Sequence, residues 1–119
     1  MEALKILIIE EEKNIASEFR ILLENNKIDG IIVNNGIDAY KSLYSALDKY
    51  NFDYIITNIG LPDENGVDII KFISNNFTSK IIIYTSKKLT FFKKRCEYDY
   101  YFKKNEKTPS DIINLILKL

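Results

Sequence analysis

Residues 53–66 read DYIITNIGLPDENG, a short apolar run followed by a loop that contains proline and glycine. The run Tyr54–Thr57 has the length and the β-branched composition of a strand buried on both faces. Pro62 and Gly66 interrupt regular structure, so we expect the strand to stop at Asn58 and a loop to follow. An asparagine therefore stands at the tip of a buried strand.

Apolar runs of strand length alternate with helical periods on both sides of this stretch. We expect further strands at residues 4–9, 31–33, 80–85 and 100–102. Apolar stripes at helical spacing occur within residues 15–23, 39–47, 67–73 and 112–119, and a weaker one lies within residues 87–97. Five strand–helix pairs in alternation predict an α/β fold with five parallel strands and helices on both faces of the sheet.

The last helix carries a strong start signal. Thr108 is placed to cap its N-terminus, Pro109 suits the first helical position, and Asp111 follows three residues after the cap. The Asp29-Gly30 pair is typical of a turn, so the second strand is expected to begin after it.

Length and composition indicate one ordinary globular domain. The chain has 119 residues, of which 46% are apolar and 29% are charged, and its net formal charge is zero. Residues 1–86 carry eight basic and thirteen acidic residues, whereas residues 87–119 carry nine and four. Cys96 is the single cysteine, which excludes an internal disulfide and fits the cytoplasm. No signal peptide or membrane span is predicted, and the lack of histidine disfavours a zinc site.

Polar side chains follow the predicted strands at their carboxyl ends, where open parallel sheets bind ligands. They are Glu10, Glu11 and Glu12 after the first strand, Asn58 after the third, Thr85 and Ser86 at the fourth, and Lys103 and Lys104 after the fifth. Carboxylates suit a divalent cation, while ammonium and hydroxyl groups suit phosphoryl oxygens. A solvated strand end is the alternative reading for the three glutamates, and it explains Glu12 better than Glu10 or Glu11.

Together these motifs resemble the receiver domain of two-component response regulators over essentially the whole chain, residues 1–119. The resemblance implies a doubly wound, flavodoxin-like (CheY-like) fold. It places Glu10 and Glu11 at the family's acidic pair, residues 59–66 at its loop after the phosphorylation site, Thr85 at its switch hydroxyl, Tyr101 at its aromatic rotamer switch and Lys104 at its invariant lysine.

The departures from the family pattern fall on its chemistry. Asn58 stands where the family has the aspartate that accepts a phosphoryl group, and a neutral amide is no substitute for an anionic nucleophile. Glu11 replaces an aspartate of the acidic pair, so magnesium binding through Glu10 and Glu11 is expected to be weak or lost. Asn105 replaces the proline that usually follows the lysine. Lys104, without an aspartate beside it, is predicted to pair with Glu10 or Glu11.

We therefore predict a pseudo-receiver, a regulatory module that binds proteins without accepting phosphate, with no enzyme activity and no cofactor. The alternative is a phosphorylatable, magnesium-dependent receiver silenced by asparagine at position 58, whether natural or engineered. That receiver would be the N-terminal regulatory domain of a DNA-binding transcriptional regulator. A small enzyme or flavin protein is disfavoured, because the chain lacks both histidine and a Gly-x-Gly-x-x-Gly turn.

Expected partners are a sensor kinase or an output domain, docked on the face formed by residues 87–119, and a homodimer through the same face is possible. Residues 87–95 mix five basic side chains with Phe91 and Phe92. A nucleic-acid surface and a solvated helix whose aromatic side chains touch the sheet both fit this pattern, and the second is preferred. Nucleic acid is expected to be reached only through a downstream domain outside this chain.

Overall fold

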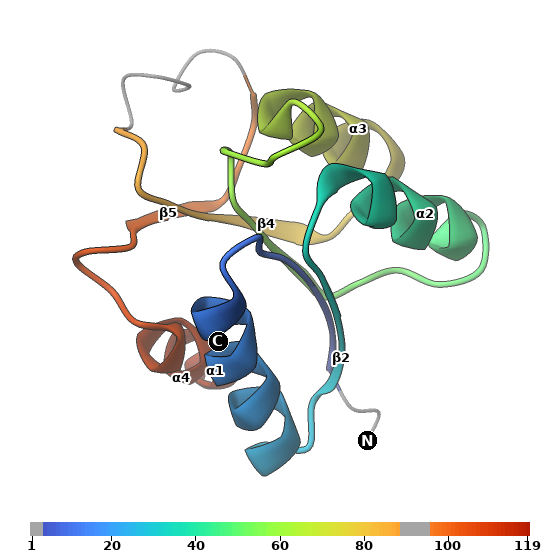
Figure 1. Ribbon diagram of the computed structural model, residues 1–119. Coiled ribbons are helices and arrows are strands. Elements are labelled where there is room, and N and C mark those ends of the chain that lie inside the picture. Colours follow the sequence, from blue (N-terminus) through green and yellow to red (C-terminus); the bar gives the residue numbers. More distant parts are fainter. Residues whose placement is uncertain (1–3, 89–95) are drawn as a thin grey trace.

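Five parallel strands form a single sheet in the order β2-β1-β3-β4-β5 (Figure 1). The computed structural model describes residues 4–88 and 96–119. Its strands are β1 (Lys5–Ile9), β2 (Asp29–Val33), β3 (Tyr54–Thr57), β4 (Lys80–Thr85) and β5 (Tyr100–Lys103). Its helices are α1 (Lys13–Asn25), α2 (Gly36–Ala46), α3 (Gly66–Asn76) and α4 (Pro109–Lys118). None of the described helices is both long enough and apolar enough to cross a bilayer.

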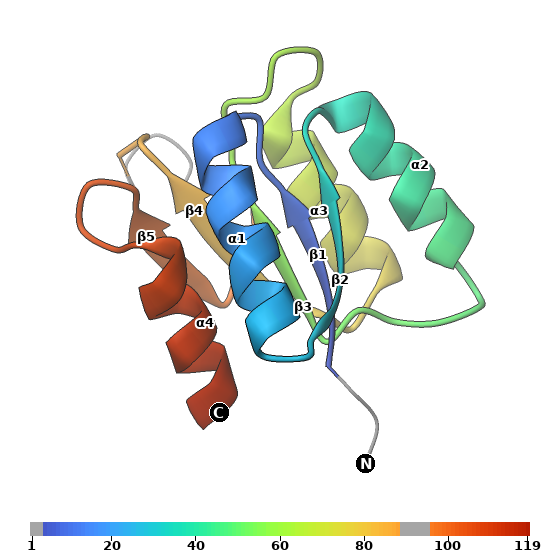
Figure 2. The same ribbon diagram turned by 60° about the horizontal axis from the view of Figure 1, so that its bottom comes forward.

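Helices cover both faces of the sheet, with α1 and α4 on one side and α2 and α3 on the other (Figure 2). Successive side chains of a strand point to opposite faces, so β1 feeds two cores. Leu7 and Ile9 belong to the cluster with α2 and α3, whereas Ile6 and Ile8 belong to the cluster with α1 and α4. The predicted fold class is confirmed, and burial of β1 on both faces explains its near-continuous apolar run.

The start of β2 and the predicted helix at residues 87–97 differ from the expectation or lie beyond the description. β2 begins at Asp29 and not at Ile31, because Asp29 and Gly30 already pair with β1. Gly30 lies close to the Leu23 side chain, whose Cδ1 would be 2.4 Å from an added Cβ and would have to move. The helix predicted within residues 87–97 falls largely outside the described residues.

The start of α4 has the predicted capping box. The Thr108 hydroxyl accepts a hydrogen bond from the Asp111 N–H at 3.2 Å, and the Asp111 carboxylate accepts one from the Thr108 N–H at 2.8 Å. Pro109 lies in the first turn, where its missing N–H costs no hydrogen bond. These bonds fix where α4 begins.

The loop between β3 and α3 is closed by a close backbone approach at Gly66. A Cβ at Gly66 would lie 2.2 Å from the carbonyl oxygen of Ile59, and Gly60 and Asn65 form an isolated bridge in the same loop. At Gly60, by contrast, the nearest atom to an added Cβ is the end of the Lys87 side chain at 3.7 Å.

We expect Gly66→Ala to lower the free energy of unfolding by about 1–3 kcal/mol, because backbone must move to admit the methyl group. Urea denaturation measures the change, and Gly60→Ala in the same loop is the control. Equal stability of both variants would show that the loop is not held at Gly66.

Candidate functional site

Glu10 is the buried anion at the carboxyl end of β1. Only 2% of it is exposed, although it follows the last residue of a strand. Its N–H donates to the Val33 carbonyl at 2.9 Å, so β1 and β2 remain paired up to this point. Its carboxylate accepts hydrogen bonds from the Glu12 N–H at 3.0 Å and from the Lys104 ammonium at 2.9 Å. Glu10 is therefore an element of the core and not a solvated strand end.

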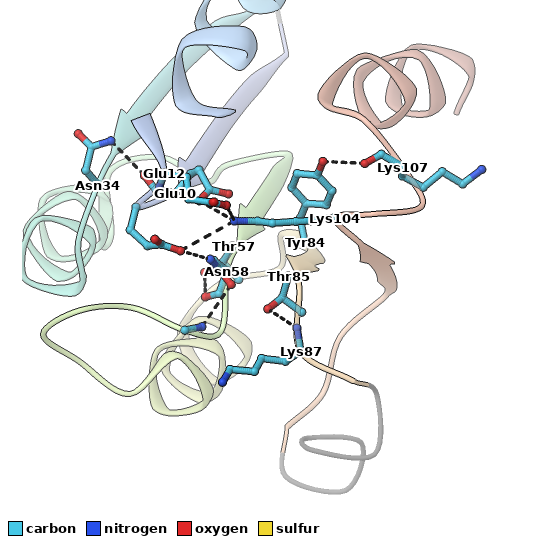
Figure 3. Close-up of polar contacts among 12 residues, drawn as sticks. Glu10, Glu12, Asn34, Thr57, Asn58, Tyr84, Thr85, Lys87, Lys104 and Lys107 are labelled. Atoms are coloured by element: carbon cyan, nitrogen blue, oxygen red, sulfur yellow. Dashed lines mark hydrogen bonds and ion pairs between the residues drawn. The ribbon is translucent and has the colours of Figure 1, made fainter. Parts of the chain in front are cut away.

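Lys104 follows the edge strand β5, and its side chain points toward this carboxylate (Figure 3). Its N–H donates to the Thr85 carbonyl at 3.0 Å, which continues the β4–β5 pairing. The Lys104 side chain is 11% exposed. Its ammonium also lies 3.8 Å from the Glu11 carboxylate and donates a hydrogen bond to Glu12. The predicted pairing of Lys104 with the glutamates is confirmed.

The pKa values of this group follow from burial and pairing. Burial raises the pKa of Glu10, and its hydrogen bonds from Glu12 and Lys104 only partly oppose that effect. Burial alone would lower the pKa of Lys104, but the hydrogen bonds to Glu12 and Glu10 prevail and raise it above its usual value. At neutral pH the ammonium therefore stays charged and neutralises part of the cluster.

Asn58 joins the end of β3 to the end of β1 through its side-chain amide. It is 4% exposed, and its backbone N–H donates to the Ile9 carbonyl at 3.1 Å. The side-chain NH₂ donates to the Glu11 carboxylate at 2.5 Å, and the side-chain oxygen accepts from the Gly60 N–H at 3.2 Å. Both ends of the amide are thus engaged, and one of them requires a donor that an ionised carboxylate lacks.

Thr85 and Tyr101 converge on the backbone of Lys87. The buried Thr85 hydroxyl accepts from the Lys87 N–H at 3.2 Å, and the Tyr101 hydroxyl donates to the Lys87 carbonyl at 2.8 Å. Tyr101 is half-buried and packs against the core cluster on the α2 and α3 side. Ser86 is exposed. The sheet therefore brings the predicted residues to one edge, although their individual roles stay predictions.

A cavity of about 640 Å³ opens beside these groups. Its lining residues are Glu11, Glu12, Ile15, Ser86, Lys103, Lys104 and Asn105. Glu10, Asn58 and Thr85 are buried and do not line it. Of the predicted site residues, Glu11, Glu12, Ser86 and Lys104 therefore border the cavity, above a buried layer of polar groups.

Two contacts of the cluster go beyond the predicted pairing of Lys104 with Glu10 or Glu11. Glu12, for which a solvated first helical turn is the alternative reading, is exposed and also accepts a hydrogen bond from Lys104. Tyr84 donates its hydroxyl to the Lys107 carbonyl at 2.7 Å, and the Lys104 ammonium lies 5.9 Å from the centre of its ring. Burial, followed by the charge of Glu10, raises the pKa of Tyr84 to about 12. The sequence gives no signal for Tyr84 beyond its place in a buried strand.

Glu10, Glu11 and Glu12 place carboxylate oxygens within 4.8 Å of one another, a spacing that could hold a metal ion. The same carboxylates already contact the Lys104 ammonium, and Asn58 directs hydrogen-bond donors toward Glu11. An ammonium and an NH₂ group supply no lone pair to a cation. The arrangement as it stands is an acidic cluster that the Lys104 ammonium partly neutralises.

Comparison with known proteins identifies the family. The model of the response regulator receiver domain matches residues 6–114. The chain belongs to this family. The chain is 34% identical over 115 residues to the response regulator ArlR of Staphylococcus saprophyticus, and 32% identical over 117 residues to ArlR of Staphylococcus aureus. Each match covers 97% of the chain but 50% of the relative, so the chain spans about half the length of these regulators.

Solved structures agree on the receiver fold. A CheY-like receiver domain protein from Methanospirillum hungatei superposes with a TM-score of 0.79 at 21% identity, covering 98% of this chain and 93% of the other. The receiver domain of a sensor histidine kinase from Pseudomonas aeruginosa, with a magnesium ion coordinated in its active site cleft, gives 0.77 at 18% identity, covering 98% and 97%. At these identities the likeness shows the fold alone.

We expect Lys104→Met to lower the free energy of unfolding of this receiver by about 3 kcal/mol at pH 7, because the buried Glu10 carboxylate loses its counter-ion. Thermal or urea denaturation measures the loss. Lys107→Met removes an exposed ammonium three residues away and is the control, with an expected change within about 0.5 kcal/mol. Comparable losses in both variants would argue against a special role for the Lys104 pair.

The cost of Lys104→Met should also depend on pH. A carboxyl whose pKa is higher in the folded state than in the unfolded state lowers stability as the pH rises through that interval. The pKa of Glu10 is already raised from 4.5 with Lys104 present, and removal of the ammonium raises it further. The stability gap between wild type and variant should therefore be widest at neutral pH and narrow as Glu10 gains a proton in acid. A gap that is constant from pH 7 to pH 4 would exclude Glu10 as the cause.

Proposed function

We propose that this receiver is a phosphorylation-independent regulatory module, which signals through protein contacts without accepting a phosphoryl group. The observation that carries the proposal is Asn58 and its hydrogen bonds. By its resemblance to the receiver motif, position 58 is that of the acceptor, and an uncharged amide with a delocalised oxygen is a poor nucleophile toward phosphorus. Here its NH₂ group is also tied to Glu11 and its oxygen to Gly60.

The cation site supports the same proposal. The Pseudomonas aeruginosa receiver coordinates magnesium in its cleft. In this receiver the Lys104 ammonium shares the three glutamates, and Asn58 removes one negative charge from the set. Magnesium requires near-octahedral oxygen ligands at short distance, which these residues do not offer with Lys104 in place. We therefore infer that the module works without a magnesium cofactor and without enzyme activity.

Partner binding is proposed for the face formed by residues 87–119, as in the receiver resemblance. In its described part, Tyr100 and Phe102 stack with ring centres 6.3 Å apart along β5, an edge strand of the sheet. Leu117 and Leu119 are 47% and 62% exposed near the end of α4. These apolar groups suit a sensor kinase, an output domain or a second copy of the receiver, in the cytoplasm.

The second candidate is a phosphorylatable receiver in silenced form, in which asparagine has replaced aspartate at position 58. The similarity to the response regulator ArlR, of which the chain spans about half, is compatible with it, and DNA binding through another domain is part of this second proposal. In that case magnesium is a true cofactor once aspartate is restored.

Phosphotransfer before and after Asn58→Asp separates the two candidates. We expect the native receiver, incubated with acetyl phosphate and magnesium, to gain no phosphoryl group by intact-protein mass spectrometry. We expect Asn58→Asp to remain unlabelled as well, and to be less stable at pH 7 by about 1–3 kcal/mol, because two carboxylates then face each other where Asn58 now donates to Glu11.

A phosphoryl group on the native chain would refute the proposed function. Labelling of Asn58→Asp together with tight magnesium binding would favour the silenced receiver. Asn65→Asp is the control, because it adds a carboxylate to the same loop but away from the glutamates. Aspartate can also cap the N-terminus of α3, as Asn65 does.

A further inference from the structure

Three aromatic side chains form an open surface on the side of the receiver that carries α2 and α3. These helices lie side by side on one face of the sheet in both views (Figures 1 and 2). The ring of Phe72 on α3 lies 5.6 Å from the ring of Tyr40 and 5.1 Å from that of Tyr44, both on α2. Tyr44 is 60% exposed, and the other two rings are partly exposed above the core.

Carboxylates border this aromatic group. Glu64 precedes α3 and Asp68 lies in its first turn, and both are exposed. The pKa of the Tyr40 hydroxyl is raised by burial first and then by the charges of Glu64 and Asp68, so both acids lie within electrostatic range of the ring. We call Tyr40, Tyr44, Phe72, Glu64 and Asp68 the acidic aromatic surface.

The loop that carries Glu64 is tied to the start of α2. The carboxylate of Asp63, next to Glu64, accepts hydrogen bonds from the N–H groups of Gly36 at 2.7 Å and Ile37 at 3.0 Å, at the start of α2. A Cβ at Gly36 would lie 2.3 Å from the Cβ of Glu64, so the loop rests directly on the helix. Because these contacts already order the loop, less conformational entropy is lost when a partner binds to it.

We propose that the acidic aromatic surface docks a protein segment that presents arginine or lysine among apolar side chains. The faces of aromatic rings attract cations, and the adjacent carboxylates add ionic attraction and hydrogen-bond acceptors. Charge favours such a partner, because α2, α3 and residues 58–65 together contain four acidic and two basic residues. Two copies meeting through the same surface would oppose like charges, so a basic segment of another protein fits better than a symmetric dimer.

This proposal does not depend on the chemistry at Asn58. The surface lies on α2, α3 and the loop before α3, whereas the cavity beside the glutamates is lined from α1 and from the segments after β4 and β5. A partner on the acidic aromatic surface would leave that cavity open.

The test is a titration of ¹⁵N-labelled receiver with a synthetic amphipathic helix built from leucine and arginine, followed by amide shifts. A peptide with glutamate in place of arginine is the matched control. We expect shifts at α2, α3 and residues 60–66, affinity that falls with added salt, and no binding of the acidic peptide.

Variants then assign the contact. Tyr44→Ser should weaken binding about fivefold or more, and Glu64→Gln with Asp68→Asn should weaken it and reduce its salt dependence. Ile21→Ser is the control, because Ile21 on α1 is 57% exposed and apolar but lies on the opposite side of the sheet. Circular dichroism melting establishes that each variant is folded.

The proposal is overturned by shifts centred on Glu11 and Glu12 instead of α2 and α3, by no binding, or by equal binding of the acidic peptide. It is also overturned if folded Tyr44→Ser binds as tightly as Ile21→Ser. None of these outcomes bears on phosphoryl transfer at position 58, so the two proposals fail separately.

Discussion

The Lys104 ammonium and the Glu10 carboxylate hold the functional edge of this receiver together. They are 94 positions apart in the chain and 2.9 Å apart in space. Each is costly to bury alone, and the ammonium offsets the mutual repulsion of Glu10, Glu11 and Glu12. Because Glu10 follows β1 and Lys104 follows β5, this cluster ties the chain after β1 to the chain after β5 at the carboxyl ends of the strands.

The loop after β3 is the second constraint, and it links the cleft to the far surface of α2 and α3. Asn58 anchors its start to Glu11, and the close approach of Gly66 to Ile59 closes its end. Between them, Asp63 binds the start of α2. One short loop thus contributes to the acidic cluster at one end and presents Glu64 at the other. A change at Asn58 that moved this loop would also move Glu64, which is part of the acidic aromatic surface.

Membership of the receiver family sets the fold but leaves open what this chain does with it. A receiver that accepts a phosphoryl group needs an attacking anion and a divalent cation. In the proposed function Asn58 takes the acceptor position by its resemblance to the receiver motif, and its amide donates to Glu11, while the Lys104 ammonium pairs with Glu10. Both features disfavour phosphoryl transfer. The Asn58 amide lacks the negative charge of an attacking carboxylate, and the Lys104 ammonium contacts the carboxylates that a metal ion would need. That agreement is the physical basis for proposing a module regulated through its protein contacts.

The sequence by itself determined the alternation of strands and helices, the capping box of α4 and the gathering of polar residues at one edge. These follow from local periods and from the rule that parallel strands place their carboxyl ends together. It also determined that residue 58 is uncharged. It misplaced the start of β2, because pairing with β1 overrides the turn preference of Asp29 and Gly30.

Only the tertiary structure decided which glutamate is buried under Lys104, that Glu12 joins the pair, and that Asn58 donates to Glu11. It alone assembled Tyr40, Tyr44 and Phe72 from two helices beside Glu64. Contacts of this kind depend on strand order and on the packing of helices over the sheet. Neither can be predicted from the local pattern of a single segment. The sequence therefore indicates which residues are candidates, and the fold determines which of them contact one another.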